Sequence, residues 1–166
     1  MRRTVAKMSG VLGALLIGAV VLLCLPLTAP RVLGYDVYAI VSGSMEPSIS
    51  TGSLVYAKQT EPAAVEPGDV IVFLGGQDGG TVITHRVVEN QTQARAFITK
   101  GDANAANDVY PVPYEHCMGR VALSVPALGY FLPAVSTMQG KLSLLGVLAG
   151  AVVLRALGAW LGREKP

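Results

Sequence analysis

The sequence predicts a mostly β protein, in which an antiparallel β-sandwich or barrel domain lies between an N-terminal and a C-terminal transmembrane helix. Three observations predict this class. Uncharged apolar stretches lie at both ends of the 166-residue chain, and the charged residues, only 14% of the total, gather in the middle. The middle contains short β-branched runs separated by turn residues. It contains no long stretch of helical periodicity.

The first expected transmembrane helix occupies the uncharged stretch between Lys7 and Arg31. With its flanks, the apolar core at residues 11–25 exceeds the roughly 20 residues that a spanning helix needs. A cleavable secretory signal is the alternative. Its apolar region would be shorter, and Pro26 and Pro30 occupy the place where a cleavage site would lie. We therefore expect an uncleaved signal anchor.

The second expected transmembrane helix covers residues 142–161, a stretch long enough to span but containing Arg155. This arginine lies near the end of the stretch, where it can extend toward the interface with Arg163 and Lys165. An amphipathic helix lying on the membrane surface is the alternative.

Basic residues flank both expected helices on the side of the chain termini, which is typical of cytoplasmic flanks. We therefore expect a cell-membrane protein with two spans, both termini in the cytoplasm and the β domain on the outer face. The expected parts are a tail and anchor at residues 1–31, an extracytoplasmic β domain at 32–140, and a helix and tail at 141–166.

Six strands are expected in the β domain, at residues 37–41, 53–58, 69–74, 81–89, 96–99 and 118–125. The proline-containing apolar segment that follows is expected to lie against the bilayer. Net charge is +2 without a basic stripe, which argues against nucleic-acid binding. No disulfide is expected between Cys24 and Cys117, because one lies in the apolar run and the other in the polar middle.

A polar turn with the sequence SGSMEPS, residues 42–48, follows the first expected strand. A serine nucleophile needs an exposed hydroxyl on a rigid turn, a nearby base, and donors for the oxyanion. Gly43 allows a tight turn and Pro47 fixes its exit, so Ser44 is the candidate nucleophile. The Ser42 hydroxyl and the Ser44 backbone N–H are the candidate oxyanion donors. The motif alone leaves an ordinary polar turn as an equal alternative.

A histidine and two aspartates provide candidate partners for this serine. His85 interrupts the strand TVITHRVVE, and an unperturbed imidazole, which titrates near 6.5, can accept a proton at neutral pH. The loop KGDANAAND, residues 100–108, contains Asp102 and Asp108, either of which could orient the imidazole. Taken separately, an inert histidine at a strand edge and aspartates in local turns are the more ordinary explanations.

In combination, these motifs resemble the type I signal peptidase family. The resemblance rests on their order and spacing over roughly residues 37–130: the serine turn, PGDVIVF, THRVV, the KGD loop, GRV and VPALGY. Common bacterial members have a lysine where this chain has His85. The chain therefore resembles the branch found in archaea, in the endoplasmic reticulum complex and in some Gram-positive bacteria.

The resemblance implies a membrane-bound serine endopeptidase that removes signal peptides from secretory precursor proteins after small residues. It assigns Ser44 as nucleophile, His85 as general base and Ser42 as the hydroxyl that assists the oxyanion. It favours Asp108 as the partner of His85, because the family has a carboxylate six residues after the G-D pair. Asp102 is expected to be a second essential or structural carboxylate, at a position suited to pinning the loop through backbone N–H groups.

The expected partners are secretory precursors and the lipid bilayer, and further subunits are left open. The cleavage region of a precursor is expected to add as a strand to an edge of the domain. Val41, Met45 and Ile83 flank the catalytic positions and are expected to form pocket walls. No cofactor and no metal are expected.

Two other functions compete with this hypothesis. A membrane-tethered assembly or binding factor could keep the fold without catalysis, but the intact serine, histidine and aspartates argue against it. A metal-dependent hydrolase could use His85, Asp102, Asp108 and His116, although one further histidine beside one cysteine is a weak metal motif. Asn90-Gln91-Thr92 also matches a glycosylation sequon.

Overall fold

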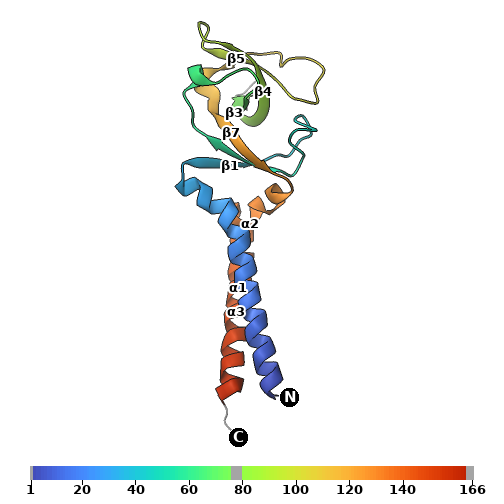
Figure 1. Ribbon diagram of the computed structural model, residues 1–166, viewed down its shortest axis with the longest axis vertical. Coiled ribbons are helices and arrows are strands. Elements are labelled where there is room, and N and C mark those ends of the chain that lie inside the picture. The colour runs from blue at the N-terminus through green and yellow to red at the C-terminus, as the bar shows by residue number, and fades with distance from the viewer. Residues whose placement is uncertain (1, 76–79, 164–166) are drawn as a thin grey trace. The chain divides into compact units, whose positions relative to one another are not determined.

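The computed structural model describes residues 2–75 and 80–163 (Figure 1). The chain forms two compact units: Pro30–Leu132 is one, and the chain up to Ala29 together with the chain from Pro133 onward is the other. The expected boundaries after residues 31 and 140 stay predictions. Lys165, which belongs to the expected positive flank, lies outside the described residues.

The helical unit contains two helices that are long and apolar enough to cross a membrane, α1 (Arg2–Val32) and α3 (Met138–Arg163). Glycines bring the two helices close together. A Cβ atom added at Gly13 would meet the Ala151 carbonyl oxygen and the Arg155 side chain, and one added at Gly158 would meet the Ala6 carbonyl oxygen. The aliphatic stem of Arg155 therefore packs against α1.

The β unit contains one antiparallel sheet of seven strands in the order β1-β2-β7-β3-β4-β5-β6. The strands are β1 (Tyr35–Ala39), β2 (Leu54–Lys58), β3 (Val70–Gly75), β4 (Thr81–Gln91), β5 (Ala96–Lys100), β6 (Val112–Pro113) and β7 (Cys117–Val125). The expected antiparallel β class with terminal helices is confirmed. β6 was not expected, because two residues that include a proline carry no strand pattern. After β7 the chain forms short helices, η3 (Leu128–Phe131) and α2 (Leu132–Ser136).

The sheet packs a hydrophobic cluster on each face, as the alternation of side chains along β3 shows. Ile71 and Phe73 belong to one cluster and Val72 to the other. The first cluster also contains Val65, Val87, Phe97, Val112 and Tyr114. The second contains Ile40, Met45, Ile49, Val55 and Ala57, so it includes residues on both sides of Ser44.

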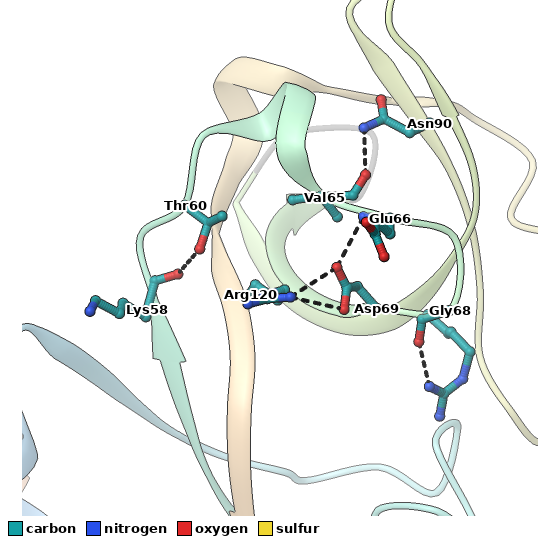
Figure 2. A network of polar contacts seen from close by, with 9 residues as sticks. Lys58, Thr60, Val65, Glu66, Gly68, Asp69, Asn90 and Arg120 are labelled. Carbon is teal, nitrogen blue, oxygen red and sulfur yellow. Dashed lines mark hydrogen bonds and ion pairs between the residues drawn. The ribbon is translucent and has the colours of Figure 1, made fainter.

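Polar contacts fix the turn that leads into β3 (Figure 2). The Asp69 carboxylate accepts a hydrogen bond from the Glu66 backbone N–H at 3.0 Å and pairs with Arg120 at 3.3 Å. The Asn90 amide donates to the Val65 carbonyl at 2.7 Å.

The Asn90 side chain is held by hydrogen bonds in the folded domain, so it is not accessible there as a glycosylation site. Its amide nitrogen donates to both Pro62 and Val65 carbonyls, and its oxygen accepts from the Tyr114 hydroxyl. An amide nitrogen has two hydrogens, and both are used here. Glycosyl transfer would have to break these bonds, so the sequon has a packing role in the folded domain.

Candidate active site

Ser44 lies in a turn after β1 that is anchored by the hydrophobic core. Met45 is 1% exposed and packs with Ile40 and Ile49. The Glu46 backbone N–H donates to the Gly43 carbonyl at 3.0 Å, and that of Ile49 donates to the Met45 carbonyl at 2.9 Å. The core side chain beside Ser44 therefore fixes the turn, while Ser44 itself stays partly exposed.

The Ser42 hydroxyl lies beside the Ser44 hydroxyl, with 3.3 Å between the two oxygens. Either hydroxyl can donate in this pair. Ser42 is thus close enough to Ser44 to donate a hydrogen bond to the carbonyl oxygen, where negative charge develops when the Ser44 oxygen attacks the carbonyl carbon.

His85 lies on β4, in register with Ile71 of β3, and is 7% exposed. The Phe73 ring contacts the imidazole edge-on, with 6.3 Å between ring centroids. β5 pairs with β4 from Arg86 onward. Among the described residues, the edge of β4 from 81 to 85 on the side of β5 therefore has no strand partner. His85 is thus the last residue of β4 before β5 begins to pair with it.

Asp108 is the aspartate that contacts His85. Its Oδ2 atom lies 2.6 Å from His85 Nδ1, and the Thr99 hydroxyl donates to the same oxygen at 2.6 Å. The Asp108 backbone N–H also donates to the Thr99 carbonyl at 2.8 Å. An ionised carboxylate only accepts hydrogen bonds, so this geometry favours a hydrogen on Nδ1 of the imidazole.

Asp102 faces Arg86 instead. The Arg86 Nε and Nη2 atoms donate to its two oxygens at 2.8 and 2.6 Å, while Nη1 donates to the Gly68 carbonyl at 2.7 Å. The Arg86 guanidinium holds the pKa of Asp102 below its usual value, and the Ser48 hydroxyl acts in the same direction. The partner that the structure gives to the Asp102 side chain is thus Arg86, whereas backbone N–H groups of the loop were expected, and its role stays a prediction.

Arg86 and Thr99 are two polar residues of this centre that the sequence analysis missed. Arg86 directly follows His85, and adjacent strand residues point to opposite faces, so Arg86 reaches a different carboxylate. The only sequence clue was its place in the THR motif. Thr99 has no sequence signal of its own, because it is one more β-branched residue of an expected strand.

The loop from 101 to 108 also contacts the serine turn. The Ala103 backbone N–H donates to the Ser44 carbonyl at 2.9 Å. A Cβ atom added at Gly101 would lie 2.6 Å from that carbonyl oxygen, so only a glycine allows this approach. One loop thus contacts the candidate nucleophile through Ala103 and the candidate base through Asp108.

Two hollows meet at His85. The Ser44 hollow, of about 590 Å³, is lined by β1 and β4 residues together with the serine turn, including Val41, Ser42, Ser44, Met45, Ile83 and His85. The His116 hollow, of about 650 Å³, is lined by Phe73, His85, Asp108, Tyr110, Pro113 and His116, among others. Because β1 and β4 are separated by three strands in the sheet order, the sheet must curl for both to line the Ser44 hollow.

The three expected pocket residues differ in their surroundings, although all line the Ser44 hollow. Val41 is 88% exposed, whereas Met45 is a core side chain.

Among the described residues, no hydrogen bond joins the Ser44 hydroxyl to His85. Such bonds often tighten only when a substrate binds.

The side chains named for a metal site do not form one cluster. Asp102 is engaged by Arg86, and His116 shares the His116 hollow with His85 and Asp108. Within the described residues, no group of three histidine, cysteine, aspartate or glutamate side chains is placed to hold a metal ion.

Comparison with curated proteins assigns the family. The chain is 31% identical over 131 residues to the signal peptidase complex catalytic subunit SEC11 of Zygosaccharomyces rouxii, covering 71% of this chain and 77% of that protein. The corresponding subunit of Eremothecium gossypii is 33% identical over 126 residues, covering 68% and 74%. The chain belongs to the type I signal peptidase family.

A bacterial signal peptidase aligns over a shorter stretch. Signal peptidase I W of Bacillus subtilis is 46% identical over 90 residues, which cover 52% of this chain. The chain spans about half, 46%, of the length of that relative. No family model matches the chain. With its two long apolar helices, the chain is a membrane protein of the signal peptidase type.

Proposed function

We propose that this signal peptidase is a serine endopeptidase of the membrane that removes signal peptides from secretory precursors after small residues. Ser44 is the nucleophile and His85 the general base. The observation that carries the proposal is the 2.6 Å contact between His85 Nδ1 and Asp108, beside a hollow lined by both His85 and Ser44.

The reaction follows from the roles of these groups. The Ser44 oxygen attacks the carbonyl carbon of the scissile bond while the free imidazole nitrogen of His85 takes its proton. The Asp108 carboxylate stabilises the imidazolium that forms. The Ser42 hydroxyl and the Ser44 backbone N–H donate to the oxyanion. His85 then gives the proton to the leaving amine, and water releases the acyl group from Ser44 by the reverse sequence.

The open strand edges provide a place for the substrate. Within the described parts of the chain, β1 pairs only with β2, and the part of β4 from 81 to 85 pairs only with β3. Both line the Ser44 hollow, so an extended peptide can form backbone hydrogen bonds there by β-addition. Val41, Met45 and Ile83 line this hollow and favour small apolar side chains. Since His85 protonates the leaving amine, the mature side of the precursor continues toward the His116 hollow.

The membrane arrangement is part of the proposal. α1 and α3 span the bilayer, both termini lie in the cytoplasm, and residues 32–140 face outward. This arrangement brings a precursor to the β unit with its apolar helix still in the bilayer, so the peptide bond at the membrane surface is the one available for cleavage.

Cleavage of a model preprotein in detergent tests the function. The full-length wild type should release the mature chain, and Ser44→Ala should release none. Ser143→Ala, on α3, is the matched control and should cleave as the wild type does, since the Ser143 hydroxyl donates to the Gln139 carbonyl of its own helix. A wild type that binds the preprotein without cleaving it would instead support the assembly-factor alternative.

A further inference from the structure

Thr99 is a fully buried residue of β5, with 0% of its surface exposed. Its hydroxyl contacts Asp108, the carboxylate that contacts His85. Its Oγ1 atom donates to Asp108 Oδ2 at 2.6 Å, and His85 Nδ1 lies 2.6 Å from that same oxygen. One carboxylate oxygen therefore receives both the threonine hydroxyl and the imidazole. A buried hydroxyl needs a hydrogen-bond partner, and Thr99 has this one.

The shared oxygen determines where the imidazole hydrogen lies. An ionised carboxylate only accepts hydrogen bonds, and the Thr99 hydroxyl that donates to Oδ2 holds this oxygen in place beside the imidazole. His85 Nδ1 must then donate to Oδ2 as well, so the hydrogen of a neutral imidazole lies on Nδ1. The lone pair is left on Nε2, the nitrogen that can take a proton from Ser44.

The position of Thr99 is fixed by the sheet. It pairs with Val87 of β4, two residues beyond His85, and its neighbours Val87 and Phe97 are fully buried. Its carbonyl accepts the Asp108 backbone N–H at 2.8 Å. Thr99 therefore holds Asp108 by both main chain and side chain, at the point where the loop from 101 to 108 ends.

We propose that Thr99 is a positioning residue of the catalytic centre, whose hydroxyl holds the Asp108 carboxylate in the orientation that keeps His85 in the Nδ1–H tautomer. The inference rests on the proposed function. It adds a fourth side chain to the serine, histidine and aspartate, one that does not touch the substrate.

Three variants of the full-length enzyme in detergent test the role kinetically. Thr99→Val replaces the hydroxyl by a methyl group of similar size, and Thr99→Ser keeps the hydroxyl. Thr99→Val should lower kcat about tenfold to a hundredfold, as expected for the loss of a hydrogen bond to a charged group, with KM unchanged. Thr99→Ser should recover most of the loss. Thr99→Ala makes the same comparison with Thr99→Ser if the valine variant does not fold.

The imidazole tautomer is a second measurement, which a purely structural role would not change. The chain has two histidines, so the nitrogen-15 spectrum of His116→Gln assigns the signals of His85. The wild type should carry its hydrogen on Nδ1, and Thr99→Val should show a mixture of tautomers, because the Asp108 carboxylate can then rotate away from Nδ1.

The outcomes separate this inference from the proposed function. Wild-type kcat in a folded Thr99→Val enzyme, or a hydrogen on Nε2 in the wild type, would overturn the role of Thr99 while Ser44→Ala remained inactive. Cleavage by Ser44→Ala would instead overturn the function itself.

Discussion

The Arg86 guanidinium holds both carboxylate oxygens of Asp102, at 2.8 and 2.6 Å. Asp102 is therefore engaged away from the imidazole, although it lies on the same short loop as Asp108. His85 and Arg86 are adjacent on β4 and point to opposite faces, so each contacts a different aspartate. The two carboxylates are thus expected to respond differently to the same substitution.

Asp108→Asn should stay folded and lose most of its turnover. An asparagine can favour the wrong tautomer of the imidazole and cannot stabilise the imidazolium. Loss of this role in a triad can cost about 10⁴ in kcat. Preprotein cleavage and melting temperature should be measured together, with Asp102→Asn in parallel. If Asp102→Asn is folded and inactive while Asp108→Asn is merely less stable, the two roles are reversed.

Asp102 should make the domain sensitive to acid. Its folded pKa lies below 3.8, the ordinary value, mainly because of the Arg86 hydrogen bonds. Its ionised form is therefore favoured by folding, and the contribution to stability is present above that value and is lost as the pH falls through the lowered pKa. Asp102→Asn should reduce the melting temperature at neutral pH, together with some activity, and should flatten its fall on the acid side. A melting temperature with the same pH dependence in both proteins would contradict this assignment.

Much of this centre could be predicted from the sequence, because Ser44 and His85 lie in short motifs with a fixed order. The strands were also predictable, since β-branched runs between turn residues are a local pattern. The contacts of Thr99 and Arg86 were not, because they depend on strand register. Thr99 reaches Asp108 nine residues away and Arg86 reaches Asp102 sixteen residues away, and a bulge between Val87 and Glu89 shifts the pairing of β4 with β5.

His85→Ala should abolish turnover, because the proposed mechanism then has no general base to take the Ser44 proton. Activity of the wild type should fall at acid pH, since a protonated imidazole cannot accept the Ser44 proton. His85→Lys should also be inactive, because a lysine needs its own desolvated pocket to lose its proton. Cleavage rates from acid to neutral pH provide the measurement, and an active His85→Ala enzyme would refute the mechanism.

The proposed topology predicts which part of the chain an external protease can reach. Protease added to intact cells should cut within residues 32–140 and leave the termini protected. Lysed cells are the control, in which the termini should also become accessible. Protection of the β unit together with cleavage of the termini would show that the orientation is reversed.

Gly101→Ala should impair catalysis through the serine turn rather than through the imidazole. The added Cβ would lie 2.6 Å from the Ser44 carbonyl oxygen and 2.8 Å from the Asn104 side-chain amide. Carbonyl oxygen and methyl group cannot approach so closely, so the Ser44 turn and the loop from 101 to 108 must separate. We expect kcat to fall at least about tenfold, as for a misplacement of roughly an ångström. Gly80→Ala is the matched control, because a Cβ there meets nothing within 4 Å, and it should cleave the preprotein at the wild-type rate. Equal activity of the two variants would show that the contact between the loop and Ser44 is not needed for catalysis.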